Sequence, residues 1–237
     1  MPFISMIGGK FGQRRKAPTP SGANGSLYFN GTSTSNLSIP NDIDLRMGTG
    51  NFTIEWYQYL QSGSGNSNPR VFSIGSYSSA SIAVSIEGGV DTSRTFYAWV
   101  SGANNMETAT NYTNQWIHFA ISRSGTSLRV FKNGTQIGST LTNSTNFSEA
   151  AQALRIGNET TVSTGAAFKG YITNFRIVKG TALYTANFTK PSSPLTSVSG
   201  TVLLLLAASD ATKNTDSSGL GKTVTNNSVT WNALNPF

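Results

Sequence analysis

The chain has 237 residues, of which only 11% are charged, and it carries a net charge of +7. It has no cysteine and one histidine, which excludes disulfides, thiolate metal sites and metal sites that need a pair of histidines. No segment shows a sustained apolar period of about 3.6 residues, whereas Gly, Ser, Thr and Asn are abundant. This composition disfavours long helices and is typical of short strands joined by tight turns.

Residues 1–25 form an arm that differs from the rest of the chain. An apolar segment comes first, then four basic residues, then the segment 18–22, whose two prolines favour an extended linker. The charges follow the apolar segment, which is the reverse of a secretory signal. We expect either a solvated tail or an anchor that docks on a larger assembly; nucleic-acid binding is less favoured, because four clustered charges are weak evidence for it. The anchoring residues would be Phe3, Ile4, Met6, Ile7, Lys10, Arg14, Arg15 and Lys16.

The predicted strands begin near residue 26 and recur at short intervals. Each is a run of β-branched, aromatic or alternating apolar residues that ends at turn residues. At most one or two helical turns are expected, within 148–155. The expected strands are 27–29, 37–39, 52–60, 71–74, 82–86, 95–100, 116–123, 128–132, 153–156, 168–178 and 201–205.

Residues 116–138 contain the two clearest hairpin signals, a Ser-Gly-Thr turn followed by an Asn-Gly pair. An Asn-Gly pair tolerates positive φ at both central turn positions, so three adjacent antiparallel strands are predicted. In the first strand, the odd-numbered residues of 117–121 are apolar, while the other face carries Trp116 and His118. We therefore expect one face on the core and the other curved around a groove.

Several segments resemble the laminin G-like branch of the concanavalin A-like jelly rolls. The resemblance is strongest for GYITNFRIVKGTALYTANFT at 170–189, and FTIEW at 52–56, WIHFA at 116–120 and RVFKNG at 129–134 agree with it. It covers about residues 26–237 and is closest to the version found in tail, fibre and capsid-associated proteins of phages and large viruses. It implies a single all-β domain, an antiparallel jelly-roll sandwich, preceded by the arm.

The resemblance also implies a function. The implied function is that of a non-enzymatic structural protein at the virion surface. It would be a capsid decoration or cement protein, or a tail- or fibre-associated protein, and the arm would fix it to other virion proteins. The alternative is a lectin-like module that binds host-surface glycans, and a homo-oligomer is compatible with both. The apolar segment 202–208 is far shorter than the ~20 residues of a membrane span, so we expect a buried strand there.

Aromatic residues beside amides are the candidates for glycan binding, because sugar sites combine an apolar wall with a few polar groups. Trp56 and Trp116 lie within strand motifs and are expected in the core. Another tryptophan comes at a strand end, next to a predicted loop with two asparagines. The candidate glycan-binding residues are Trp99, Asn104, Asn105 and Tyr112.

Catalysis and metal binding are not expected. Glycoside hydrolysis needs two carboxylates across a cleft, but the ten acidic residues are scattered and no predicted strand has two on one face. Calcium needs about six or more oxygen ligands, and Asp42-Ile43-Asp44 is the one closely spaced pair of carboxylates. We interpret these two as turn residues, with calcium as the alternative, and predict no cofactor.

One ion pair is predicted. Glu55 is the one acidic residue inside a clear strand, and Arg176 is a lone charge among the apolar residues of another. Buried charges are tolerated when they are paired. We expect Glu55 and Arg176 to hold two adjacent strands together.

Overall fold

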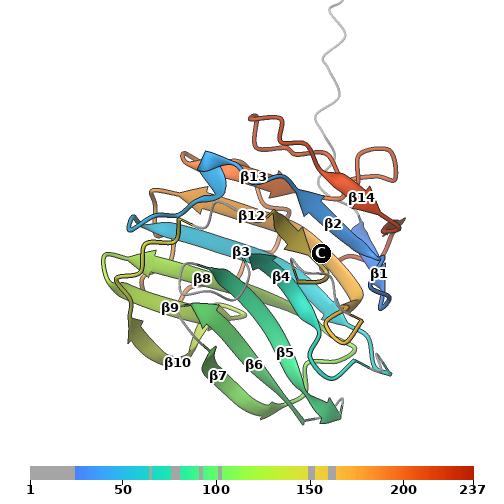
Figure 1. Cartoon of the computed structure of the whole chain (residues 1–237), viewed down its shortest axis with the longest axis horizontal. Coiled ribbons are helices and arrows are strands. Elements are labelled where there is room, and N and C mark those ends of the chain that lie inside the picture. Colours follow the sequence, from blue (N-terminus) through green and yellow to red (C-terminus); the bar gives the residue numbers. More distant parts are fainter. Residues whose placement is uncertain are drawn as a thin grey trace, which may run out of the picture.

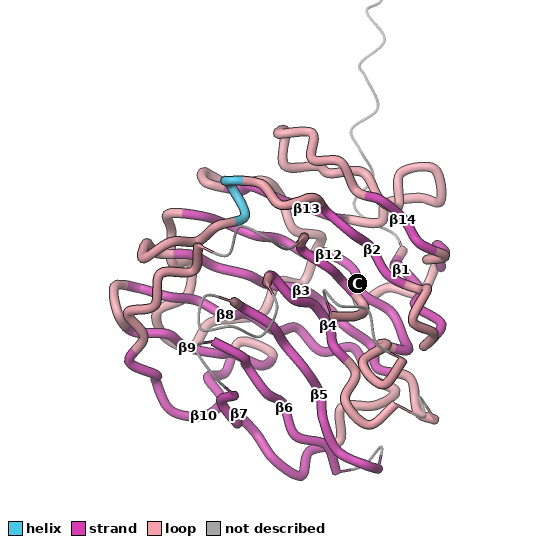
Figure 2. The backbone as a smooth tube through the Cα atoms, in the orientation of Figure 1, coloured by secondary structure: helices cyan, strands magenta, loops and turns pink. Residues whose placement is uncertain are grey.

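The computed structural model describes residues 25–63, 66–75, 81–90, 93–100, 103–148, 153–159 and 164–237. Within these ranges, fifteen β-strands and one short 3-10 helix, η1 (Ile43–Leu45), form two antiparallel sheets that pack face to face (Figures 1 and 2). This is the all-β sandwich expected from the sequence. No helix in the described ranges is long and apolar enough to cross a membrane.

The larger sheet, sheet A, has eight strands in the order β10-β9-β8-β3-β12-β1-β15, with β13 as a further partner of β12. The first half of β12 pairs with β1 and its second half pairs with β13. The strands are β1 (Ser26–Asn30), β3 (Phe52–Leu60), β8 (Trp116–Ser124), β9 (Ser127–Lys132), β10 (Thr135–Thr142), β12 (Lys169–Lys179), β13 (Thr201–Leu205) and β15 (Thr230–Asn232).

The smaller sheet, sheet B, has seven strands in the order β14-β2-β11-β4-β5-β6-β7. These are β2 (Asn36–Ile39), β4 (Arg70–Ile74), β5 (Ile82–Val90), β6 (Ser93–Val100), β7 (Ala103–Thr110), β11 (Leu154–Ile156) and β14 (Thr225–Asn227).

One local prediction in sheet B was wrong. The loop predicted around Asn104 and Asn105 is part of β7, an edge strand paired with β6. Asn is depleted in strands, so its composition concealed a strand that forms by pairing with a neighbour. Of the segment 148–155, the structure describes 148 and 153–155, and these residues are not helical; β11 begins at Leu154.

The inner faces of the two sheets form one hydrophobic core. At its centre Trp56 of β3 is fully buried and lies against the rings of Phe72, Phe119 and Phe175, with centroid distances of 5.3, 5.7 and 6.3 Å. These rings come from both sheets and supply large apolar areas that stabilise the sandwich. The core position predicted for Trp56 is confirmed.

The predicted hairpins are also present. β8, β9 and β10 are adjacent, and Asn133 and Gly134 in the second turn have φ values of 50° and 84°. The odd-numbered residues of 117–121 face the core, as the alternation predicted. Local turn chemistry and period-two patterning were sufficient to place these three strands.

The outer face of sheet A is partly covered by residues 181–196, which we call the covering segment. Its backbone receives hydrogen bonds from Tyr57 and Arg176 at Pro191 and Thr196, and it donates one from Phe188 to Gly134 in the β9–β10 turn. Below this segment the outward side chains of sheet A are buried. They include Thr53, Glu55, Tyr57, His118, Ala120, Phe131 and Arg176.

Candidate functional site

Four aromatic side chains lie in one row across four neighbouring strands of sheet A. Tyr28 of β1 is opposite Tyr171 of β12, Tyr171 is opposite Tyr59 of β3, and Tyr59 is opposite Trp116 of β8. Directly opposed residues of an antiparallel sheet project to the same face. The register therefore gathers the four rings on the outer face of sheet A, and we call them the aromatic row.

The rings of the aromatic row contact one another and remain accessible. The centroid distances are 5.0 Å for Tyr28 to Tyr171, 5.7 Å for Tyr171 to Tyr59 and 5.8 Å for Tyr59 to Trp116. Each residue is half-buried. Successive rings are inclined by 40°, 79° and 64°, so the row is a tilted series of faces and not a flat platform.

Polar groups along the aromatic row are available for a ligand. Within the described part of the chain, no hydrogen bond engages the hydroxyl groups of Tyr28, Tyr59 and Tyr171, and these oxygens are not buried. Burial, together with the neighbouring Tyr28 and Tyr59, raises the pKa of Tyr171, which keeps its phenol protonated as a donor. The row thus combines apolar faces with unused hydrogen-bonding groups.

The neighbours of the aromatic row differ on its two sides. On one side the next outward positions are Asn30 and Lys169, which pair across β1 and β12. On the other side Tyr57 is buried by the covering segment and by Phe237, whose ring is 41% exposed and lies 5.2 Å from that of Tyr57. The row is therefore the uncovered part of the aromatic surface of sheet A.

A glycine allows the backbones of β12 and β3 to approach closely at the centre of the aromatic row. Gly170 has a φ of 146°, and a Cβ atom there would lie 2.1 Å from the carbonyl oxygen of Tyr59. Only glycine fits such a close backbone approach at this φ. The approach brings β12 against β3 where Tyr171 meets Tyr59.

The prediction that Trp116 lies in the core was wrong. Trp116 projects outward because it is out of phase with the core-facing residues 117, 119 and 121 of β8. The alternation itself contained this signal, since it placed Trp116 on the same face as His118. What the sequence did not show was which aromatic residues of other strands would lie beside it.

Of the four glycan-binding candidates from the sequence, the two whose side chains the structure describes, Trp99 and Tyr112, do not share a surface. Tyr112 is fully buried against Phe96 and Phe119, and its hydroxyl donates to Glu107, so it cannot contact a surface ligand. The side chains of Asn104 and Asn105 lie outside the described residues. Trp99 is half-buried on β6, in the sheet opposite the aromatic row.

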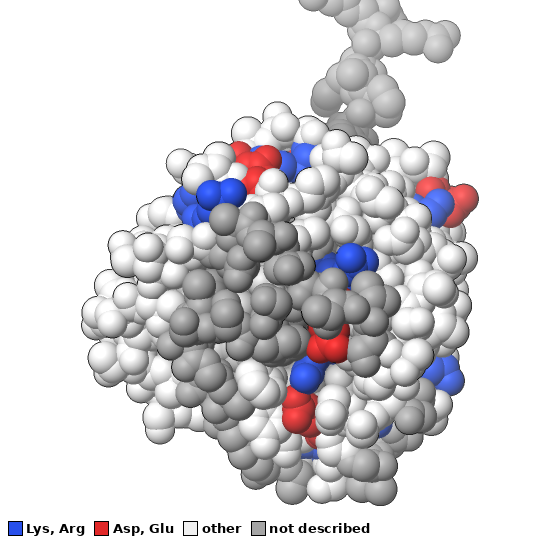
Figure 3. Space-filling view, viewed as in Figure 1, with Lys and Arg blue, Asp and Glu red and all other residues white. Residues whose placement is uncertain are grey.

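Trp99 belongs to a separate cluster on the outer face of sheet B. Its Nε1 donates to Ser85 at 2.9 Å, and the guanidinium of Arg70 lies 5.4 Å from the ring centroid. Arg70 in turn pairs with Glu87 at 2.5 Å and with Glu159 at 3.8 Å. Figure 3 shows acidic and basic side chains gathered in a line on this face. The charges of this cluster are engaged with one another.

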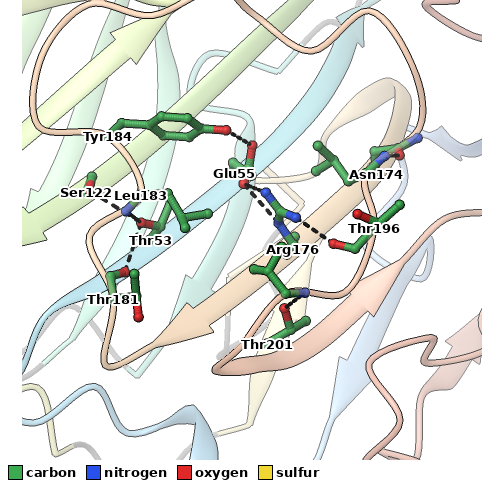
Figure 4. Close-up of polar contacts among 12 residues, drawn as sticks. Thr53, Glu55, Ser122, Asn174, Arg176, Thr181, Leu183, Tyr184, Thr196 and Thr201 are labelled. Atoms are coloured by element: carbon green, nitrogen blue, oxygen red, sulfur yellow. Dashed lines mark hydrogen bonds and ion pairs between the residues drawn. The ribbon is translucent and has the colours of Figure 1, made fainter.

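The structure brings together the predicted ion pair of Glu55 and Arg176 (Figure 4). Nε and Nη2 of Arg176 both donate to Oε1 of Glu55, at 2.9 and 2.5 Å. Oε2 accepts from His118 Nε2 at 3.1 Å and from the Tyr184 hydroxyl at 2.9 Å. The carboxylate is fully buried, and Tyr184 belongs to the covering segment. The network therefore fixes the covering segment to sheet A.

The network around Glu55 makes the stability of the fold sensitive to acid. Burial opposes the ionisation of Glu55, but the hydrogen bond from His118 and the charge of Arg176 outweigh it and lower the pKa of Glu55. A carboxyl with a lowered folded pKa stabilises the fold at any pH above its unfolded pKa, and this stabilisation is lost as the pH falls through the folded value.

We therefore expect the stability difference between wild type and Glu55→Gln to shrink as the pH falls below the ordinary pKa of glutamate. Urea unfolding at a series of pH values measures this difference. Glu87→Gln, on a partly exposed carboxyl, serves as the control. A difference that stays constant into acid would contradict the assignment.

Asp42 and Asp44, the carboxylates considered for calcium, both bind the ammonium group of Lys222, at 2.7 and 2.6 Å. Asp42 also caps η1 by accepting from the backbone N–H of Asp44. No cluster of three or more metal-ligating side chains occurs in the part of the chain that the structure describes. The predicted anchoring residues of the arm, from Phe3 to Lys16, lie outside the described residues.

Comparisons with known proteins assign the chain to a family. A laminin G family model, described as the concanavalin A-like lectin/glucanases superfamily, matches residues 30–183, more than half of the chain. No curated protein matches the sequence.

Three solved structures with similar folds are distant from this chain in sequence. A candidate carbohydrate-binding protein from Bacteroides ovatus ATCC 8483 has a TM-score of 0.69 at 14% identity, covering 92% of this chain and 62% of that one. The heptameric SAP-like pentraxin from Limulus polyphemus has a TM-score of 0.53 at 16% identity, covering 69% and 79%. Tailspike protein 2 of bacteriophage CBA120 has a TM-score of 0.47 at 14% identity, covering 73% and 30%, which is too distant to support an inference. The family match shows that the chain belongs to the concanavalin A-like lectin/glucanases superfamily, in its laminin G-like branch.

Proposed function

We propose that the chain is a non-catalytic carbohydrate-binding domain that holds a sugar chain along the aromatic row. The observation that carries this proposal is the register that places four half-exposed aromatic rings side by side on sheet A. The apolar faces of sugar rings pack on aromatic rings, while sugar hydroxyls bond to the free tyrosine hydroxyls. A sheet is also a rigid support for such a surface.

The dimensions of the aromatic row favour a chain of several sugars. The row provides one ring per strand at spacings between 5.0 and 5.8 Å, comparable to the length of one pyranose unit. The rings are inclined to one another, so they suit a soluble chain that turns along its length better than the flat face of a crystalline polysaccharide. The fold shared with the Bacteroides protein supports the proposal by analogy alone.

The carboxylates near the aromatic row argue against catalysis. Glu55 is the one acidic residue on β1, β3, β8 and β12, the strands that form the row. It is fully buried below the covering segment and bonded to Arg176, His118 and Tyr184. Glycoside hydrolysis needs two carboxylates that flank the bond to be cleaved. The row therefore supports binding without cleavage.

A glycan array probed with a multivalent form of the protein tests this function. Multivalent display converts weak single-site binding into measurable avidity. We expect binding that strengthens with oligosaccharide length and persists in EDTA, because the row has no carboxylate to hold calcium. No binding to any glycan, with or without calcium, would overturn the proposal.

Attachment to a virus particle is a second role, and it is supported by the sequence of the arm. Strand β1 begins at Ser26 and the family match begins at residue 30, so the arm precedes both. Its apolar side chains would each contribute about 1.5–3 kcal/mol if a partner buried them. In this role the arm fixes the glycan-binding domain to a capsid or tail protein.

Removal of residues 1–25 is expected to leave the melting temperature within a few degrees of wild type and to prevent incorporation into particles. Differential scanning calorimetry and a particle-assembly assay measure the two effects. Unfolding of the truncated protein, or its normal incorporation, would show that the arm is part of the fold or dispensable.

A further inference from the structure

A polar groove of about 730 Å³ lies on the outer face of sheet B, where β14, β2 and β11 run side by side. Its lining consists of hydroxyl groups, amides and one charged side chain, Arg155 of β11. Ser38 of β2 and Thr225 of β14 are among the hydroxyl residues. The groove is on the sheet opposite the aromatic row and shares no residue with it.

Arg155, which is half-buried, has fewer hydrogen-bond partners in the described part of the chain than Arg176 or Arg123. Its Nη1 donates to Oδ1 of Asn36 at 2.6 Å, but its Nε is buried without a hydrogen-bond partner. By contrast, Arg176 pairs with Glu55 at 2.5 Å, and Arg123 donates to several backbone carbonyls. Within the described residues no carboxylate pairs with Arg155. Partial burial of this cation costs hydration that no anion in these ranges replaces.

Arg155 is held in place by a second layer of contacts. Oδ1 of Asn36 also accepts from Asn227 at 3.0 Å, and Nδ2 of Asn36 donates to the carbonyl of Ser33 at 2.9 Å. Asn36 is 3% exposed, so its orientation is fixed by burial as well. The guanidinium is thus held through Nη1, and because Nε is buried, the donor left for a ligand is Nη2, which has no partner among the described residues.

We propose that this groove binds the carboxylate of an acidic sugar. The planar guanidinium, held by Asn36, directs its Nη2 donors at a carboxylate in a fixed geometry that an ammonium group cannot reproduce. The surrounding hydroxyl and amide groups suit the hydroxyl groups of a sugar. An anion in the groove would also offset the desolvation of Arg155.

NMR titration of the full chain with trigalacturonate, and separately with its methyl ester, tests the proposal. We expect trigalacturonate to shift the amide resonances of β2, β11 and β14, and the neutral ester to leave them in place. Arg155→Gln should weaken binding about tenfold or more. Arg155→Lys, which keeps the charge without the fixed guanidinium geometry, should also weaken it.

Arg129→Gln is the matched control, because it removes the same charge from a half-buried position on sheet A. The Arg129→Gln variant should bind trigalacturonate as wild type does. Equal binding of the ester, unchanged binding by Arg155→Gln, or equally strong binding of polyglutamate at the same resonances would overturn the proposal. Variants that lack the aromatic row should show the same amide shifts with trigalacturonate as wild type. A result against one site can therefore be distinguished from a result against the other.

Discussion

Replacing Arg176 with methionine is expected to lower the free energy of unfolding by about 3–5 kcal/mol. Arg176 is 5% exposed and supplies two hydrogen bonds to Glu55, which is completely buried. Without Arg176, the buried carboxylate of Glu55 keeps only two hydrogen-bond partners among the described residues, the imidazole of His118 and the hydroxyl of Tyr184. The covering segment also loses the bond from Arg176 to the carbonyl of Thr196. Urea unfolding at neutral pH measures the change.

The double variant Glu55→Leu with Arg176→Met separates charge burial from packing. Removing both partners of a buried pair costs far less than removing one, because no unpaired charge remains. We therefore expect the double variant to be more stable than Arg176→Met alone. Arg176→Met with the stability of wild type would contradict the structural role of the pair.

The double variant Tyr59→Ala with Tyr171→Ala is expected to lower the affinity for the oligosaccharide selected by the array about a hundredfold. These two residues form the centre of the aromatic row, and their rings lie 5.7 Å apart. Each lost ring removes about 1.4 kcal/mol of apolar contact and stacking, which is tenfold in affinity. Isothermal titration calorimetry measures the loss.

The matched control for the row is Tyr97→Ala with Trp99→Ala, which removes two neighbouring aromatic rings from sheet B. Its affinity should equal that of wild type. Both double variants need a cooperative thermal transition, because a loss of fold would also abolish binding. If the sheet B variant lost binding and the sheet A variant kept it, the glycan site would be on sheet B and the proposal would be wrong.

Local patterns in the sequence were sufficient for many of the strands and for one part of the interior, while the sandwich was implied by the family resemblance. The alternation of 117–121 and the turn at Asn133 and Gly134 depend on neighbouring residues alone, so they could be predicted. Glu55 and Arg176 could be matched because each is a lone charge among apolar neighbours. The strand β7 was missed because its composition opposes a strand and only pairing with β6 reveals it.

The aromatic row could not be predicted from the sequence, because it depends on long-range register. Tyr28, Tyr59, Trp116 and Tyr171 come from four separate strands, and a shift of one residue in any pairing would turn that ring to the other face. The burial of Tyr112 also depends on long-range packing and could not be predicted. Tyr112 looked like a loop aromatic near Trp99, whereas the fold places it in the core.

Chemical-shift mapping of the bound oligosaccharide on the isotope-labelled protein shows whether sugars bind along the aromatic row. We expect the largest changes on the aromatic resonances of Tyr28, Tyr59, Tyr171 and Trp116, whose rings lie side by side. Changes confined to the Trp99 cluster of sheet B, with the aromatic row unaffected, would contradict the proposed function.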